Sequence, residues 1–207
     1  MQRKSGLLIV PVLLIAFILL IAGCTTTPPP VTPTPTATVP VPTTSTPALP
    51  PATGMLTLLI SDDENAIGDF SQLVVNLSAV RIHQPGNGSV YTEVPLHEAV
   101  DLTTVTGNRT IDVLDINLTP GMYTKIELDV ARINGTVNGS SVDVNVPSNR
   151  LEIVREFTIA AGQTTTFIFD ISVVREGMSN RYNLLPVIAK SGIVGKDVGD
   201  PEMVTLP

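Results

Sequence analysis

Hydrophobic and polar residues alternate along most of the chain after Gly54. A period of two places successive side chains on opposite faces of an extended strand, so one face of each strand is expected to be buried. The alternation is clearest in residues 126–130 and 167–173, and it recurs at 151–159. The apolar positions of the first two runs predict one shared core, formed by Phe167, Phe169, Ile171, Ile126, Leu128 and Val130.

The run from residue 73 to residue 82 changes phase part-way along. Its apolar residues first fall on one phase and then on the other: Leu73, Val75 and Leu77, then Val80 and Ile82. One extra residue in a strand produces such a slip, which predicts a β-bulge near Ala79. Asn76 lies before the slip and on the phase opposite to Val75, so its side chain is expected to point outward.

Clusters of turn-forming residues separate the strand-like runs. Asn138-Gly139 is the strongest of them, because Asn and Gly adopt the positive φ angles of a two-residue hairpin turn. Thr119-Pro120-Gly121 and Ala161-Gly162 mark two more turns, and only residues 96–100 suggest a single helical turn. The pattern predicts an all-β fold, an antiparallel Greek-key β-sandwich of seven to nine strands. The sandwich is expected over residues 54–195, with a C-terminal tail at 196–207.

The long apolar run at the N-terminus has the layout of an export signal. Arg3 and Lys4 precede an almost wholly apolar stretch, and Ile21-Ala22-Gly23-Cys24 closes it as a bacterial-type lipobox. We therefore predict a signal peptide over residues 1–23, cleavage before Cys24 and lipidation of the Cys24 sulfur. An uncleaved anchor helix is the alternative, but Pro11 and a length of about 16 residues, short of the roughly 20 that span a bilayer, disfavour it.

Residues 24–53 are expected to form a spacer that follows the lipidated cysteine. Positions 25–53 contain 11 Thr and 10 Pro, with no charged or aromatic residue. A Pro-rich segment favours extended polyproline II at about 3.1 Å per residue and cannot pack a core. The sandwich is therefore predicted on the extracytoplasmic face of the cell membrane, attached through the lipid on Cys24.

The charge balance argues against nucleic acid as a partner. The chain has 12 basic and 19 acidic residues, and two of the basic ones precede Cys24. The mature chain would keep 10 basic residues against 19 acidic ones, a net charge of −9. So acidic a protein is poorly suited to binding phosphate backbones. The partners expected instead are an envelope protein or a glycan.

Most catalytic motifs that a sequence can reveal are missing. Cys24 is the single cysteine, the two histidines are His83 and His97, and neither Gly-x-Ser-x-Gly nor His-Glu-x-x-His occurs. His83 is expected to be an exposed residue at a strand end. We expect that the protein is not an enzyme and binds no cofactor. A carbohydrate-active hydrolase that uses paired carboxylates is the alternative.

An acidic cluster follows the first predicted strand. It consists of Asp62, Asp63 and Glu64, with Asp69 close by. Calcium prefers clusters of oxygen ligands, but the spacing does not match an EF-hand loop. A solvated turn is the first interpretation, and a calcium-stabilised adhesion domain is the alternative.

Asn-x-Ser/Thr sequons are more frequent than chance predicts, and six are present. N-glycosylation needs an accessible acceptor amide, although Asn is also common in turns for conformational reasons. The combination of a lipobox with many sequons is typical of an exported archaeal protein. The candidate glycosylation sites are Asn76, Asn87, Asn108, Asn117, Asn134 and Asn138.

The order of several motifs resembles a known family. The series opens with Gly54-Met55-Leu56-Thr57-Leu58-Leu59-Ile60-Ser61-Asp62, continues through Leu118-Thr119-Pro120-Gly121-Met122-Tyr123, and closes with Tyr182-Asn183-Leu184-Leu185-Pro186-Val187-Ile188. It resembles a family of exported prokaryotic lipoprotein domains known only as a domain of unknown function. The resemblance covers about residues 54–190 and implies a prealbumin-like or carboxypeptidase-regulatory-like sandwich. It implies no catalytic residues. The expected role is a non-enzymatic binding or structural module of the cell envelope.

Overall fold

The computed structural model describes residues 52–86 and 90–205. The expected signal peptide, Cys24, Asn87 and almost all of the spacer lie outside the described residues. Among the residues that are described, no helix is long and apolar enough to cross a membrane.

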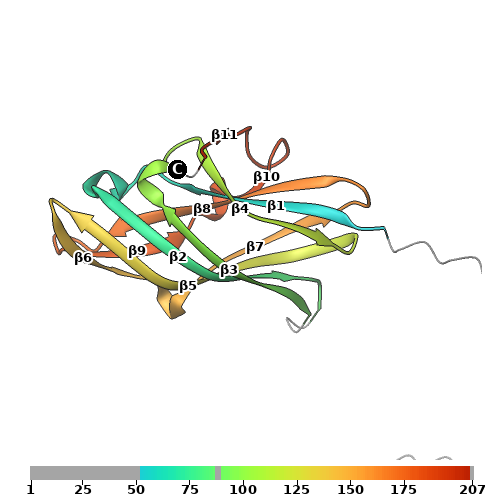
Figure 1. Ribbon diagram of the computed structural model, residues 1–207, viewed down its shortest axis with the longest axis horizontal. Coiled ribbons are helices and arrows are strands. Elements are labelled where there is room, and N and C mark those ends of the chain that lie inside the picture. The colour runs from blue at the N-terminus through green and yellow to red at the C-terminus, as the bar shows by residue number, and fades with distance from the viewer. Residues whose placement is uncertain (1–51, 87–89, 206–207) are drawn as a thin grey trace, which may run out of the picture. The chain divides into compact units, whose positions relative to one another are not determined.

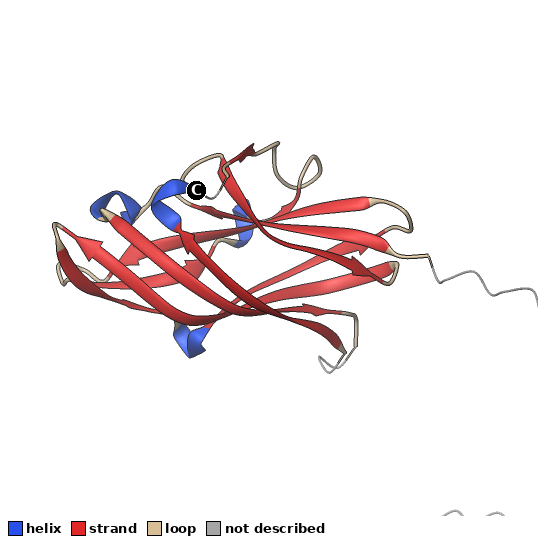
Figure 2. Cartoon of the chain, in the orientation of Figure 1, coloured by secondary structure: helices blue, strands red, loops and turns tan. Residues whose placement is uncertain are grey.

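The described part of the chain is almost entirely β-structure, with four single-turn 3-10 helices (Figures 1 and 2). The strands are β1 (Gly54–Asp62), β2 (Gln72–His83), β3 (Tyr91–Asp101), β4 (Arg109–Leu118), β5 (Gly121–Val137), β6 (Ser140–Asn145), β7 (Arg150–Ile159), β8 (Thr164–Arg175), β9 (Arg181–Pro186), β10 (Gly192–Ile193) and β11 (Glu202–Met203). The helices are η1 (Ala66–Asp69), η2 (Leu102–Thr104), η3 (Pro147–Asn149) and η4 (Ile188–Lys190).

The strands form two layers, and the predicted β-sandwich is confirmed. Sheet 1 has the order β4-β1-β8-β9, with β10 beside β8 and β11 beside β4; sheet 2 has the order β3-β2-β5-β7. β6 pairs with β5 through residues 140–142 and with β9 through residues 143–145, so it connects the two sheets. Most pairs are antiparallel, but β1–β8, β6–β9 and β4–β11 are parallel.

The facing sides of the two sheets enclose one hydrophobic core. All six residues predicted to share it are buried within a single cluster, and the most exposed of them, Val130, has 7% of its surface accessible. Burial of these apolar side chains is the main term that stabilises the sandwich. The period-two pattern therefore identified the inward phase of β5 and β8 correctly.

The predicted bulge and the predicted orientation of Asn76 are both confirmed. The pairing of β2 with β3 and with β5 skips a residue between Leu77 and Ala79. Val75 before the bulge is 1% exposed, whereas Asn76 is half-exposed and its amide nitrogen lies 3.5 Å from the Arg132 carbonyl oxygen.

The turn residues adopt the conformations that their types predict. Asn138 and Gly139 have φ angles of 50° and 77° in the β5–β6 hairpin, as a two-residue turn of this kind requires. Thr119 and Pro120 connect β4 to β5. There the Tyr123 hydroxyl donates a hydrogen bond to the Thr119 carbonyl oxygen at 2.8 Å. The predicted helical turn at residues 96–100 is wrong, because these residues pair with β2 as part of β3.

Candidate functional site

The C-terminal segment crosses the outer face of sheet 1. We call residues 187–204 the C-terminal strap. The Val187 amide donates to the Asp170 carbonyl oxygen at 2.9 Å, and the Val204 amide donates to the Thr110 carbonyl oxygen at 2.7 Å. Arg155 of β7 fixes the strap from the side, because its guanidinium donates to the Ile188 carbonyl oxygen at 2.9 Å. The strap is therefore hydrogen-bonded to sheet 1 near both of its ends.

The strap buries a face of β8 that alternation alone would leave in solvent. Ile168, Asp170 and Ser172 point away from the core, yet they are 6%, 3% and 3% exposed. The carboxyl group of so deeply buried an aspartate must either be protonated or have partners that balance its charge. The surroundings of Asp170 therefore identify the most unusual polar site on this sheet.

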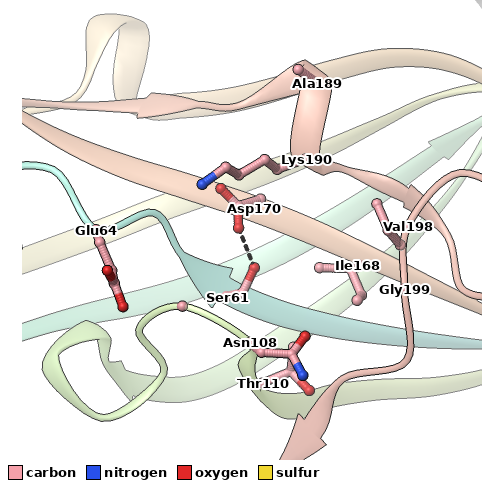
Figure 3. A pocket seen from close by; sticks show the side chains of 11 residues that line it. Ser61, Glu64, Asn108, Thr110, Ile168, Asp170, Ala189, Lys190, Val198 and Gly199 are labelled. Carbon is pink, nitrogen blue, oxygen red and sulfur yellow. Dashed lines mark hydrogen bonds between the residues drawn. The ribbon is translucent and has the colours of Figure 1, made fainter.

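A polar cleft of about 450 Å³ opens beside Asp170 (Figure 3). Its floor comes from β1, β4 and β8, one wall from the loop before β4, and the other wall from η4 and the rest of the strap. Figure 3 shows Lys190 on the η4 side of Asp170, with Asn108 and Thr110 on the far side. The residues that line the cleft are Ser61, Glu64, Gly107, Asn108, Thr110, Ile168, Asp170, Ala189, Lys190, Val198 and Gly199.

Hydrogen bonds fix the Asp170 side chain while leaving one of its oxygens without a partner. The Ser61 hydroxyl donates to Asp170 Oδ2, and the Asp170 amide donates to the Ser191 hydroxyl at 2.9 Å. Asp170 Oδ1 is buried and accepts no hydrogen bond. Burial raises the pKa of the Asp170 carboxyl to about 6, although the hydrogen bond from Ser61 opposes the shift.

Lys190 is the cation of the cleft. Its ammonium contacts Asp63 Oδ1, and this hydrogen bond raises the pKa of the Lys190 side chain. The charges of Asp170 and Glu64 act in the same direction. One ammonium, in contact with Asp63, therefore lies in the field of three carboxylates, and the cleft has an excess of negative charge.

The acidic cluster that the sequence suggests as a calcium site is spread over different environments. Asp62 points into the sandwich and is fully buried, Asp63 pairs with Lys190, and Glu64 is exposed at the cleft. Asp69 accepts a hydrogen bond from the Tyr182 hydroxyl at 3.0 Å. Over residues 52–86 and 90–205, no group of three or more His, Cys, Asp or Glu side chains is arranged to hold a metal ion.

Asp62 is the most strongly perturbed acid on the core side of sheet 1. Neither of its carboxyl oxygens has a hydrogen-bond partner. Burial, reinforced by the charges of Asp170 and Asp63, raises the pKa of the Asp62 carboxyl to about 8. The side chain is therefore mostly protonated at neutral pH, which removes the cost of a buried charge.

Most of the sandwich matches a known protein family. A family model described as a domain of unknown function, DUF4382, matches residues 53–186. The chain belongs to the DUF4382 family. No curated protein matches the chain. No solved structure matches it either. The matched range of the DUF4382 domain ends at Pro186, so the strap lies outside it.

His83 of the DUF4382 domain is not the exposed strand-end residue that the sequence suggests. It is 5% exposed, its ring packs against Tyr91 at 5.0 Å between centroids, and its Nε2 lies 3.3 Å from Glu127 Oε1. The charged side chains that cover the outer face of sheet 2 explain this burial. His97 is exposed on β3 and lies apart from the cleft.

Glu127 is the centre of that charged face. It is 4% exposed, with Lys125 Nζ at 2.5 Å and Arg150 Nη1 at 3.3 Å. Burial alone would raise the pKa of Glu127, but the hydrogen bond and charge of Lys125 lower it below its usual value. The ion pairs connect β2, β5 and β7, which gives this face a structural role, while both ring nitrogens of His83 are buried without a hydrogen-bond partner.

The sequons of the DUF4382 domain lie on several parts of its surface. Asn117, Asn134 and Asn138 are exposed, and Asn76 is half-exposed. Asn108 is exposed at the cleft, where its amide nitrogen donates to the Asp200 carbonyl oxygen at 3.1 Å. Glycosylation of Asn108 would attach a glycan to that same nitrogen, directly beside the strap.

Proposed function

We propose that this chain is a lipid-anchored module of the cell envelope that binds a partner on the extracytoplasmic face and catalyses no reaction. One observation supports the binding role most directly: a buried carboxylate at the cleft, Asp170, has an oxygen without a partner. Buried polar atoms are nearly always satisfied, so an exception beside a cleft favours a ligand that completes it. The partner is an envelope protein or a glycan.

The proposed location depends on the N-terminal sequence. The lipobox at residues 21–24 supports cleavage before Cys24 and attachment of a diacylglycerol, whose two acyl chains suffice for stable anchoring. The Thr/Pro-rich spacer would then hold the sandwich away from the membrane surface. The lipobox together with the sequons favours an archaeal source, and the Leu-Thr-Pro-Gly-Met-Tyr turn favours a prealbumin-like relationship.

Ser61 illustrates why binding is favoured over hydrolysis. Its hydroxyl lies beside Asp170, a nucleophile–base pairing in principle, but Ser61 is 3% exposed and its proton already bonds to Asp170 Oδ2. Neither of the two histidines lines the cleft, so no imidazole is placed to pass the proton of Ser61 to a leaving group. The pair therefore holds the carboxylate in place.

A carbohydrate-active hydrolase is the second candidate, favoured by two carboxylates, Asp170 and Glu64, that line the same cleft. A raised pKa, as at Asp170, is what a general acid needs. The calcium-stabilised adhesion alternative gains no such support, because Asp62, Asp63 and Asp69 have separate partners or environments.

Two measurements test the proposal. In the first, the native chain should partition with membranes and carry lipid by mass spectrometry, whereas Cys24→Ser should be released or keep an uncut signal. Equal size and partition of the two chains, with no lipid on the native one, would exclude the anchor. In the second, the full chain should capture a partner from envelope extracts, and Asp170→Asn should lose it. Asp143→Asn, an exposed acid away from Asp170, is the matched control.

A further inference from the structure

The charges of the cleft are not balanced. Lys190 is influenced by Asp63, Asp170 and Glu64 together, and the three carboxylates exceed its single charge by two when all are ionised. Glu64 is exposed, and no hydrogen bond or ion pair is formed by its carboxylate within the described residues. The cleft can therefore accept a further positive charge.

The hydrogen-bonding groups of the cleft point to the same class of ligand. The hydroxyl of Ser61 donates to Asp170, and the hydroxyl of Thr110 donates to Met203 Sδ at 3.3 Å. The amide nitrogen of Asn108 donates to the Asp200 carbonyl oxygen. Each of these three side chains uses a donor within the protein, while the Asn108 amide and the Lys190 ammonium keep further N–H groups. The acceptor oxygens on Asp170, Glu64 and Asn108, together with the excess negative charge, favour a ligand that supplies donors.

From this arrangement we propose that the cleft binds a ligand that carries a primary ammonium group, held by the two acids that line the cleft without a cationic partner of their own, Asp170 and Glu64. Small α,ω-diamines and the amino groups of larger molecules belong to this class. The inference rests on the proposed binding function and names the chemistry of its ligand. A cleft of about 450 Å³ has room for an ammonium and the carbon chain that bears it.

Two other cations fit the cleft less well. A guanidinium binds a carboxylate best through both oxygens, but Asp170 Oδ2 is occupied by Ser61. A divalent metal needs several oxygen ligands at once, and the described residues hold no such group. An ammonium is a compact charge with three donors, and it needs only one free oxygen from each neighbour. Lys190 already places an ammonium of this kind at the cleft, in contact with Asp63.

Isothermal titration of the full chain in detergent with putrescine (1,4-diaminobutane) tests the inference. Asp170→Asn and Glu64→Gln should each weaken binding about tenfold, the usual effect of losing one charged hydrogen bond. Lys190→Met should strengthen it severalfold, because the internal competitor is removed. Glu64 is exposed, so its substitution leaves the core intact and gives a result even if Asp170→Asn folds poorly.

Matched variants and ligands separate the outcomes. Asp143→Asn and Lys196→Met, both exposed and outside the cleft, should bind putrescine as the native chain does. Equal binding of 1,4-butanediol, tighter binding of calcium, or no putrescine binding would overturn the ammonium assignment. In each of these cases, capture of an envelope partner that still depends on Asp170 would leave the proposed binding function standing. Loss of that capture as well would reject both.

Discussion

Replacing Asp62 by asparagine should change how the stability of the sandwich depends on pH. Asp62 is fully buried, and burial together with the charges of Asp170 and Asp63 raises the pKa of its carboxyl from 3.8 to about 8. The folded chain therefore keeps a proton that the unfolded chain releases. Stability from this group is fully present below the unfolded pKa and is lost as pH rises toward the folded pKa.

The window between pH 6 and pH 8 isolates Asp62 from its neighbour. The pKa of Asp170 is raised only to about 6, so most of its contribution is lost below this window. A difference of one bound proton lowers the free energy of unfolding by about 1.4 kcal/mol per pH unit, or up to about 3 kcal/mol between pH 6 and pH 8. An asparagine side chain cannot ionise, so this slope should disappear in Asp62→Asn. The buried amide itself costs about 1–3 kcal/mol at every pH, so the slope is the diagnostic quantity.

Urea unfolding at closely spaced pH values measures this slope, with the linear dependence on urea fitted at each pH. The native chain should become less stable from pH 6 to pH 8, and the exposed substitution Asp143→Asn should follow it in parallel. If Asp62→Asn keeps the native slope, the carboxyl is not held protonated by burial, and the explanation of its missing partners is wrong.

Two further substitutions test the core and the charged face. Phe169→Ala removes a fully buried ring and should cost about 3–5 kcal/mol in urea unfolding, against under about 0.5 kcal/mol for Val154→Ala at a 61% exposed site; a loss below about 1 kcal/mol would place Phe169 outside the core. Glu127→Gln removes the buried carboxylate that Lys125 and Arg150 share, and since Lys125 keeps Glu152 and Arg150 keeps Asp129, it should cost about 1.5–3 kcal/mol, the usual range for a hydrogen bond to a charged group. Glu152→Gln removes an exposed partner of Lys125 and should cost under about 1 kcal/mol, and equal losses would contradict the central role of Glu127.

The fold could be predicted from the sequence because strand periodicity and turn chemistry are local. Alternation identified the buried phase of β5 and β8, and the phase slip located the bulge after Leu77. The same local reasoning wrongly predicts a helical turn at residues 96–100. Leu96 and Val100 are four positions apart, as on one face of a helix, but both face the core from strand β3. The parallel pairing of β1 with β8 joins segments more than a hundred residues apart, and no local pattern encodes it.

Most of the candidate site could not be predicted from the sequence, because it too depends on contacts between segments that are far apart in the chain. Asp170 occupies the polar phase of β8, where alternation indicates solvent. Its burial requires the strap, and the Ser61 and Lys190 that surround it are 109 and 20 positions away in the chain. The available signal was weak: two apolar residues, Ile168 and Val174, interrupt the polar phase of β8 on which Asp170 lies. The burial of His83 is equally invisible in the local sequence, because the side chains that bury it, Tyr91 and Glu127, come from neighbouring strands.

Only part of the cleft lies within the range that matches the DUF4382 family, so membership of the family does not by itself imply the cleft. The floor residues, Ser61 and Asp170 among them, lie within the range that matches DUF4382, but Lys190 and the other strap residues lie beyond it. Without the strap, Asp170 would lose the Ser191 hydroxyl and the cover that raises its pKa, and it would become an ordinary ionised surface acid. The cleft is therefore a property of this chain with its strap in place. A DUF4382 domain that ends where the match ends would keep the sandwich and its core while lacking one wall of the site.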